Sequence, residues 1–217
     1  MKEIITAATA AEEVRDGDTI MIGGFMCCGQ PLTIVDALLD CGVKDLTVIT
    51  NDSGWPDRGF GKLVAAKRVK KLIASHVGLN PEVAKQMFAG TLEVELVPQG
   101  TLAERIRCGG AGLGGVLTPT GIGTEVEDGK QKISLDGRDY LLETPLRADF
   151  AFISGTVTDR AGNTFIAKSE KNFNTVMATA SHRTVVETRT VVERGELDPD
   201  KVTVPGVFIK SIVEAGK

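Results

Sequence analysis

The fold is decided by the stretch from Asp16 to Pro31, which reads Asp-Gly-Asp-Thr-Ile-Met-Ile-Gly-Gly-Phe-Met-Cys-Cys-Gly-Gln-Pro. Thr19–Ile22 is short, apolar and rich in β-forming residues, so it is predicted to be a buried strand. The glycines that follow allow tight or left-handed turns. Pro31 suits the first turn of the helix that the next apolar residues predict. The stretch therefore predicts a strand, a glycine-rich loop and a helix.

The loop between this strand and helix is a candidate ligand site. In open α/β sheets such loops lie at the carboxyl ends of the strands, where ligands bind. Free backbone amides and the helix N-terminus favour an anionic or polar group there. The loop is not G-x-G-x-x-G, because Gly23 and Gly24 are adjacent and the next glycine is Gly29. No Gly-Lys-Ser/Thr closes a P-loop either, so a simple turn that binds nothing stays open as the alternative.

Residues 1–107 repeat the pattern of strand, loop and helix. Further strands are predicted at Leu46–Thr50, Val69–Ser75 and Leu92–Val97, and helices at Thr6–Val14, Leu32–Cys41, Gly59–Ala66, between Asn80 and Gly90, and at Thr101–Arg107. Such alternation is typical of an open, mostly parallel α/β sheet with helices on both faces. We therefore expect one α/β domain over residues 1–217.

The stretch from 108 to 147 departs from this pattern. Cys108–Gly123 is rich in glycine and is expected to be a long, irregular loop. Two short strands are predicted on either side of Asp136-Gly137, a dipeptide that favours a two-residue hairpin turn. We expect a small β-hairpin excursion here, followed by a buried strand at Ala148–Ser154 and strand-like pieces near the end, including Val202–Ile212.

Charge and cysteine content exclude several classes of function. The chain has 25 basic and 29 acidic residues, for a formal net charge of −4, and its basic clusters are short, which argues against nucleic acid or an anionic membrane as partner. The 4 cysteines lack Cys-x-x-Cys spacing and there are 2 histidines, so no metal site is expected. With no apparent signal peptide or membrane span, we expect a cytoplasmic protein with free thiols.

Three loops are expected to meet at one edge of the sheet. They are the loop Gly23–Gln30, which we call the glycine loop, the turn that starts at Asn51, and Gln99-Gly100. Each of them follows a predicted strand. The side-chain amides of Asn51 and Gln99 could then hold a carboxylate or a thioester oxygen. The plainer alternatives are that Asn51 bonds its own backbone in a turn and that Gln99 is an exposed turn residue.

Several motifs give the chain a specific resemblance to a known family. They are the run Asp16–Pro31 together with Val97–Arg107, Gly109–Gly121, Pro145–Asp149, Gly162-Asn163 and Asn172-Phe173-Asn174. From about residue 3 to residue 213 the chain resembles the family I CoA-transferases. Its Gly-Gly-Ala-Gly-Leu-Gly-Gly run is most similar to that of the alpha subunits that act on acetate, butyrate and acetoacetate.

The resemblance implies an activity, a partner and a set of binding residues. It implies transfer of CoA from an acyl-CoA to a free carboxylate by ping-pong covalent catalysis through a glutamate, with CoA as co-substrate and no other cofactor. It also implies a beta subunit in an α2β2 heterotetramer. The residues expected to bind CoA or substrate are Gly24, Phe25, Met26, Cys27, Cys28, Gly29, Gln30, Asn51, Gln99 and Gly100.

The chain departs from the family at the nucleophile. The family carries its glutamate in a Glu-Asn-Gly turn, and no glutamate of this chain is followed by asparagine. The nearest stretch is Ser169-Glu170-Lys171-Asn172, in which we interpret Glu170 as a surface charge. We therefore expect no catalytic residue in this chain and no turnover without the beta subunit.

Two other functions would use the same kind of fold. One is a ligand-sensing domain for a sugar phosphate, which rests on analogy of fold alone. The other is a sugar-phosphate isomerase, for which Asp52 and Glu104 would be candidate acid and base, although nothing in the sequence brings them together.

Overall fold

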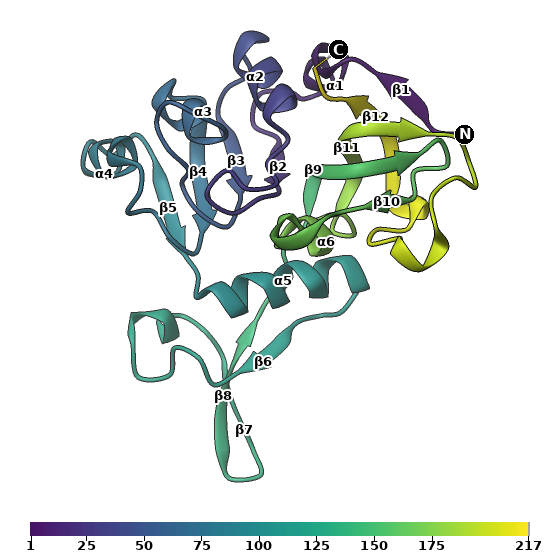
Figure 1. Cartoon of the computed structure of the whole chain (residues 1–217). Coiled ribbons are helices and arrows are strands. Elements are labelled where there is room, and N and C mark those ends of the chain that lie inside the picture. The colour runs from purple at the N-terminus through teal and green to yellow at the C-terminus, as the bar shows by residue number, and fades with distance from the viewer. Residues whose placement is uncertain (217) are drawn as a thin grey trace.

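The computed structural model describes residues 1–216, and its centre is a nine-stranded sheet (Figure 1). Along the sheet the strand order is β1-β12-β11-β9-β2-β3-β4-β5, with every neighbouring pair parallel, while β10 pairs antiparallel with β9. The strands are β1 (Glu3–Ile5), β2 (Thr19–Ile22), β3 (Leu46–Ile49), β4 (Val69–Ala74), β5 (Glu93–Leu96), β9 (Ala148–Asp159), β10 (Thr164–Phe165), β11 (Ser181–Val192) and β12 (Ile209–Glu214). The expected mostly parallel sheet is confirmed.

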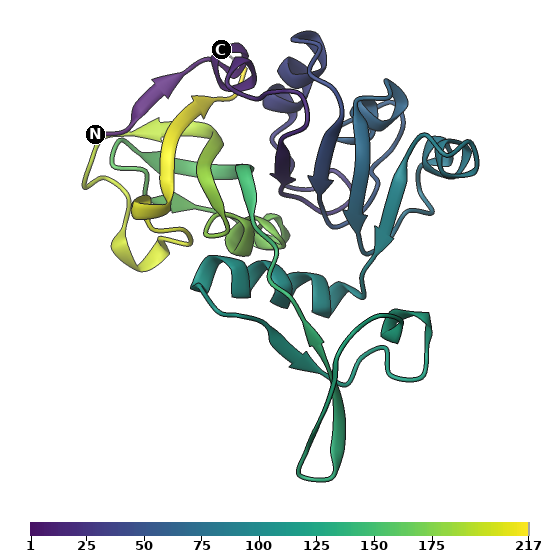
Figure 2. The same cartoon turned by 180° about the vertical axis from the view of Figure 1, so that it is seen from behind.

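Helices cover both faces of this sheet, as predicted (Figures 1 and 2). The helices are α1 (Ala7–Glu12), α2 (Leu32–Asp40), α3 (Gly61–Ala65), α4 (Pro81–Phe88), α5 (Gln99–Ala111) and α6 (Asn174–Met177), with 3-10 turns η1 (Glu125–Glu127), η2 (Lys168–Lys171), η3 (Pro199–Lys201) and η4 (Gly206–Phe208). One buried cluster joins the sheet to α1–α4, through residues such as Leu38 and Val83. A second joins its other face to α5 and α6, through residues such as Ile106 and Met177.

The strand order changes direction beside β2. From β2 the chain proceeds outward to β3, β4 and β5, and it then returns to build β9 on the other side of β2. Ligands of open α/β proteins bind at such a switch point, at the carboxyl ends of the strands. The glycine loop that follows β2 lies at this position, and α5 lies across the end of the sheet to which β2–β5 point (Figure 1).

A second, three-stranded sheet projects from the body, below α5 in Figure 1. It consists of β6 (Val116–Thr118), β7 (Lys132–Leu135) and β8 (Arg138–Glu143), in the order β6-β8-β7. The predicted hairpin is confirmed: Asp136 and Gly137 have φ angles of 50° and 75°, as a two-residue primed turn requires.

The glycine-rich stretch is more regular than the sequence predicted. Cys108–Ala111 continues α5, and Val116–Thr118 forms β6, so the expectation of one long irregular loop was wrong. Gly109 and Gly110 are needed for close packing: a Cβ at Gly109 would lie 1.9 Å from the Leu146 carbonyl oxygen. The tertiary contact, rather than a need for flexibility, explains glycine inside a helix.

The end of the chain also differs from the prediction. Residues 202–208 contain the 3-10 turn η4 instead of a strand, and regular pairing starts at Ile209. The edge strand β1 was not predicted, because three residues are too few to show a period. No helix within residues 1–216 has the length and apolar character needed to cross a membrane.

Candidate functional site

The glycine loop closes on itself as a tight hairpin. Phe25 and Cys28 pair through both backbone hydrogen bonds, with N···O distances of 3.0 and 2.8 Å. The two residues at the tip, Met26 and Cys27, have φ angles of 47° and 69°. Left-handed backbone is unfavourable for side chains of this size and costs on the order of 1–2 kcal/mol per residue. The surrounding contacts must therefore hold this turn in place.

Asp52 holds the tip of this turn, while Asn172 donates from Nδ2 to the Cys28 carbonyl at 3.1 Å. The backbone amide of Met26 donates to Oδ2 of Asp52 at 2.9 Å, and the amide of Gly54 donates to Oδ1 at 2.9 Å. The Asn51 side chain donates from Nδ2 to the same Oδ2 at 2.8 Å. Asp52 is 2% exposed. One buried carboxylate thus joins the loop after β2 to the loop after β3.

The structure brings Asn51 and Gln99 together. Nε2 of Gln99 donates to Oδ1 of Asn51 at 2.7 Å, and the Ser75 hydroxyl lies 3.2 Å from the same oxygen. Asn51 is 1% exposed, and both ends of its amide are engaged. Asn51 thus supports Gln99, which is exposed at the start of α5. That Asn51 itself binds CoA or substrate stays a prediction.

A recess of about 410 Å³ opens beside Gln99. Its lining residues are Phe25, Gln99, Gly100, Ala103, Asn172, Phe173 and Val176. Pro98 precedes α5 without a side-chain cap, and the first helical hydrogen bond runs from the Leu102 amide to the Pro98 carbonyl. The preceding amides at this helix N-terminus attract negative charge. The recess therefore combines an apolar wall with an end that favours a carboxylate or a thioester oxygen.

Four other predicted loop residues line a second recess, of about 320 Å³. It is bordered by Cys27, Cys28, Gly29 and Gln30, together with residues of β9 and β11. Gln30 is 5% exposed; its Oε1 accepts from the Phe60 amide at 2.9 Å, and its Nε2 has no partner within residues 1–216. Burial, followed by the charge of Asp52, raises the pKa of the Cys27 thiol. Seven of the predicted site residues thus line one of the two recesses, and the other three, Gly24, Met26 and Asn51, line neither.

The start of α2 does not offer a ligand site. Glu187, on β11, accepts from the amide of Ile34 at 2.8 Å and from that of Thr33 at 3.2 Å. Its carboxylate occupies the position that an anion would take at this helix N-terminus. The expectation that the start of α2 would attract a ligand anion was therefore wrong. Burial raises the pKa of the Glu187 carboxyl group.

Asn174 holds the glycine loop, although the sequence did not predict it as a site residue. It is fully buried; its Oδ1 accepts from the Ser154 amide at 2.9 Å, and its Nδ2 donates to the Gly29 carbonyl at 2.8 Å. A Cβ at Gly23 would lie 1.9 Å from Asn174 Oδ1, which explains the glycine there. The signal was the Asn-Phe-Asn motif at residues 172–174, which the sequence showed without indicating its target.

Glu170 is not the surface charge that the sequence predicted. Its side chain is 17% exposed and forms an ion pair with Arg189. Its second carboxylate oxygen is buried and has no partner within residues 1–216. Glu170 lines the second recess, away from the wall formed by Gln99 and Gly100.

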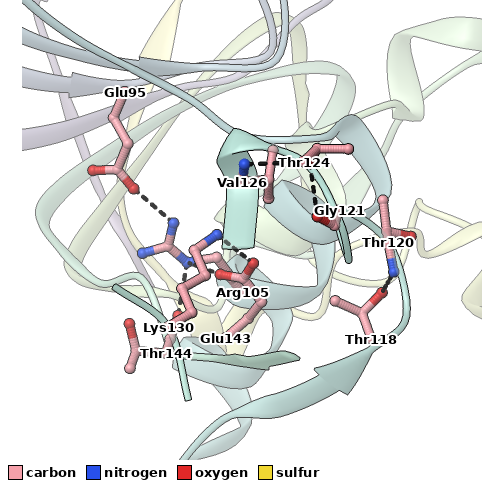
Figure 3. A network of polar contacts seen from close by, with 10 residues as sticks. All are labelled: Glu95, Arg105, Thr118, Thr120, Gly121, Thr124, Val126, Lys130, Glu143 and Thr144. Atoms are coloured by element: carbon pink, nitrogen blue, oxygen red, sulfur yellow. Dashed lines mark hydrogen bonds and ion pairs between the residues drawn. The ribbon is translucent and has the colours of Figure 1, made fainter. Parts of the chain in front are cut away.

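Helix α5 is fixed from below by the charged network in Figure 3. Arg105 donates to Glu95 of β5 at 2.7 Å and to the Thr144 carbonyl at 2.8 Å. Glu143, which is 2% exposed, lies 3.9 Å from Arg105 and 2.6 Å from Lys130. The network joins α5 to the sheet edge and to the projecting sheet. Because Gln99 lies at the start of the same helix, this network also sets its position.

Comparison with known proteins gives this geometry a context. Residues 4–215 match the profile of the coenzyme A transferase family. The chain is 52% identical over 211 residues to the acetate CoA-transferase subunit alpha of Escherichia coli (strain K12), which covers 97% of this chain and 96% of that protein. It is 53% identical over 200 residues to the acetoacetyl-CoA:acetate/butyrate CoA transferase alpha subunit of Clostridium acetobutylicum, covering 92% of each.

A solved structure has the same fold at lower identity. An acyl-CoA transferase from Escherichia coli O157:H7, in a thioester complex with CoA, superposes with a TM-score of 0.85 at 22% identity over 98% of this chain. This chain spans 47% of the length of that one.

Proposed function

The chain belongs to the coenzyme A transferase family, and we propose that it is the alpha subunit of an enzyme that moves CoA between short-chain acyl groups, with acetate, butyrate and acetoacetate as the carboxylates. The observation that carries this proposal is the identity of 52–53% to two alpha subunits named for these substrates, over more than nine tenths of the chain. The whole chain, residues 1–217, acts as one unit in this proposal.

The recess beside Gln99 is the proposed place for the acyl group and the carboxylate. Phe25, Phe173 and Val176 supply an apolar wall that suits a short alkyl chain. The exposed amide of Gln99 and the uncapped start of α5 supply donors for the carboxylate or thioester oxygen. Gly100 leaves the backbone open at this position, where a Cβ would meet no atom within 4 Å, and Gly24 allows the close packing of Gln30, whose Cγ would lie 2.3 Å from a Cβ there. The residues from Met26 to Gln30 form the turn that carries Phe25.

The chemistry proceeds through a glutamate of the partner subunit. Its carboxylate attacks the thioester carbonyl of the acyl-CoA; the carbon–sulfur bond breaks, and CoA leaves as the thiolate. The thiolate then attacks the glutamyl carbonyl of the resulting anhydride, which releases the first carboxylate and leaves CoA on the glutamate as a thioester. A second carboxylate reverses these steps and leaves as the new acyl-CoA. A carboxylate nucleophile needs no general base, which agrees with a chain that contains 2 histidines.

The assembly and compartment follow from the same proposal. The partner is a beta subunit, in an α2β2 heterotetramer; the relatives named as alpha subunits support the existence of such a partner. The cytoplasm is the proposed compartment, because Cys27, Cys28, Cys41 and Cys108 are free thiols and a reducing compartment keeps them so.

Reconstitution with the partner tests this function. The chain is purified alone and after co-expression with a family beta subunit that carries Glu-Asn-Gly, and each sample is given acetoacetyl-CoA with acetate or butyrate. We expect acetyl-CoA or butyryl-CoA to form with the complex only. Turnover by the chain alone, or none by a stable complex with any of these carboxylates, would contradict the proposal.

A further inference from the structure

We infer that Asp52 is a positioning residue that sets the direction in which the side-chain amides of Asn51 and Gln99 point. The inference rests on the proposed function for its catalytic consequence, and on the geometry of the isolated chain for its structural one. Asp52 does not line the recess; it lies between the loop after β2 and the loop after β3 and is 2% exposed.

Asp52, Asn51 and Gln99 are joined by a chain of hydrogen bonds. The chemistry of the carboxylate gives that chain one direction. A carboxylate accepts hydrogen bonds and cannot donate them, whereas an amide has one donating and one accepting end. Asn51 must therefore turn Nδ2 toward Asp52 Oδ2, which it reaches at 2.8 Å. Its Oδ1 then faces the other way, so that Gln99 must present Nε2, at 2.7 Å.

The same constraint determines how the side-chain amide of Gln99 is oriented in the recess. With one Nε2 hydrogen committed to Asn51, Gln99 retains its second Nε2 hydrogen and its Oε1, each at a fixed position. If the chain of hydrogen bonds reversed, the nitrogen and oxygen of Gln99 would exchange places, and the donor would move to the other arm of the amide. A substrate oxygen bound by the original donor would then meet an acceptor.

Asp52 fixes the opposite wall by the same means. Its Oδ2 also accepts from the amide of Met26 at 2.9 Å, at the tip of the left-handed turn that carries Phe25. Phe25 and Gln99 border the same recess. Two side chains from loops far apart in the sequence are thus held in register by one buried carboxylate.

Substitution of Asp52 in the assembled enzyme tests the catalytic consequence. Asp52→Asn keeps the shape but places an amide nitrogen against one of the donors. We expect kcat/KM for the acceptor carboxylate to fall about 10–100-fold in the complex, because a misplaced donor costs rate of this order. Asp57→Asn, at an exposed aspartate of the neighbouring turn, is the matched control and should stay within about twofold of wild type. If Asp52 were purely structural, Asp52→Asn would lower the melting temperature of the complex and leave kcat/KM of the folded complex unchanged. That result would overturn the inference.

A double-variant cycle on the chain alone tests the direction itself. Gln99→Glu puts an acceptor opposite Asn51 Oδ1, so it should lower the melting temperature more than Gln131→Glu, a matched exposed change elsewhere. Combined with Asp52→Asn, the same glutamate can accept from a reversed Asn51. The double variant should therefore melt higher than the sum of the two single shifts predicts. Strictly additive shifts would contradict the inference.

The two measurements separate failure of the inference from failure of the proposed function. If the wild-type complex transfers no CoA, the proposed function fails, and the melting cycle still decides the role of Asp52. If Asp52→Asn does not fold, the comparison of Gln99→Glu with Gln131→Glu decides it: an equal effect of these two would refute a directional chain.

Discussion

At the scale of single residues, buried acids shape this edge of the sheet. Asp52 accepts from two loops, and Glu187 accepts from the start of α2. Burial raises the pKa of Glu187 because it disfavours the charged form, and the backbone amides of Ile34 and Thr33 oppose this in part. Glu187 therefore makes the stability of the folded chain depend on pH.

The sign of this dependence follows from the raised pKa. The group holds its proton more tightly in the folded chain, so its contribution to stability is full below the unfolded pKa and is lost as pH rises through the folded pKa. Glu187→Gln removes the titration. The melting temperature of wild type minus that of Glu187→Gln should fall as the pH is raised from the ordinary glutamate pKa of 4.5 through the higher pKa of the folded chain. Thermal melts across this range check it, with the exposed Glu193→Gln as control; a difference that is constant or grows with pH would rule the account out.

At the scale of elements, α5 connects the packing of the body to the candidate site. Its last turn contains Gly109 and Gly110, which lie against the Leu146 carbonyl and Thr179. Its first turn carries Gln99 and Gly100, which border the recess. Glycine is thus closely packed in the last turn of α5, whereas a Cβ at Gly100 in the first turn would meet no atom within 4 Å.

This contrast gives a prediction about stability. Gly109→Ala should lower the free energy of unfolding by about 1–3 kcal/mol, because the new Cβ overlaps backbone that must move. Gly100→Ala, at a position with no atom within 4 Å of the new Cβ, should raise it by up to about 1 kcal/mol through helix propensity. Urea unfolding of the two variants measures both values. An equal effect of the two substitutions would show that the close contact at Gly109 does not matter.

Elements with a strong local signal could be predicted from the sequence. The predicted strand Thr19–Ile22 coincides with β2 residue for residue. Asn80 caps α4, as the sequence indicates, by accepting a hydrogen bond from the Glu82 amide. Tertiary contacts decided what could not be predicted. Gly109 looked like a loop residue because its contact with Leu146 is not visible in the sequence. Glu187, for the same reason, gave no sign of occupying the N-terminus of α2.

The candidate site was predicted in outline but not in its hydrogen bonding. The loops after β2, β3 and β5 were expected at one edge because parallel strands share an edge, and Gln99 does reach Asn51. The direction of the Asn51 amide depends on Asp52, whose burial no local pattern reveals. The hydrogen bond from Asn174 to the Gly29 carbonyl likewise joins residues far apart in the sequence, so no local pattern indicates it.

At the scale of the whole molecule, the described residues that line the recess beside Gln99 include no carboxylate. The recess beside Gln99 is lined by apolar side chains, an amide and a helix N-terminus. Glu170 lies in the stretch that most resembles the family's Glu-Asn-Gly motif. It forms an ion pair with Arg189 and borders the other recess. The proposed function therefore requires the reacting carboxylate to come from the partner subunit.

The location of the covalent CoA intermediate tests this requirement most directly. The assembled complex is mixed briefly with acetoacetyl-CoA in the absence of an acceptor carboxylate. The subunits are then separated, and the mass of each is measured by intact mass spectrometry. The account predicts a mass increase equal to one bound CoA on the partner subunit, none on this chain, and none on either when the partner's Glu-Asn-Gly glutamate is replaced by alanine. A CoA adduct on this chain would contradict it.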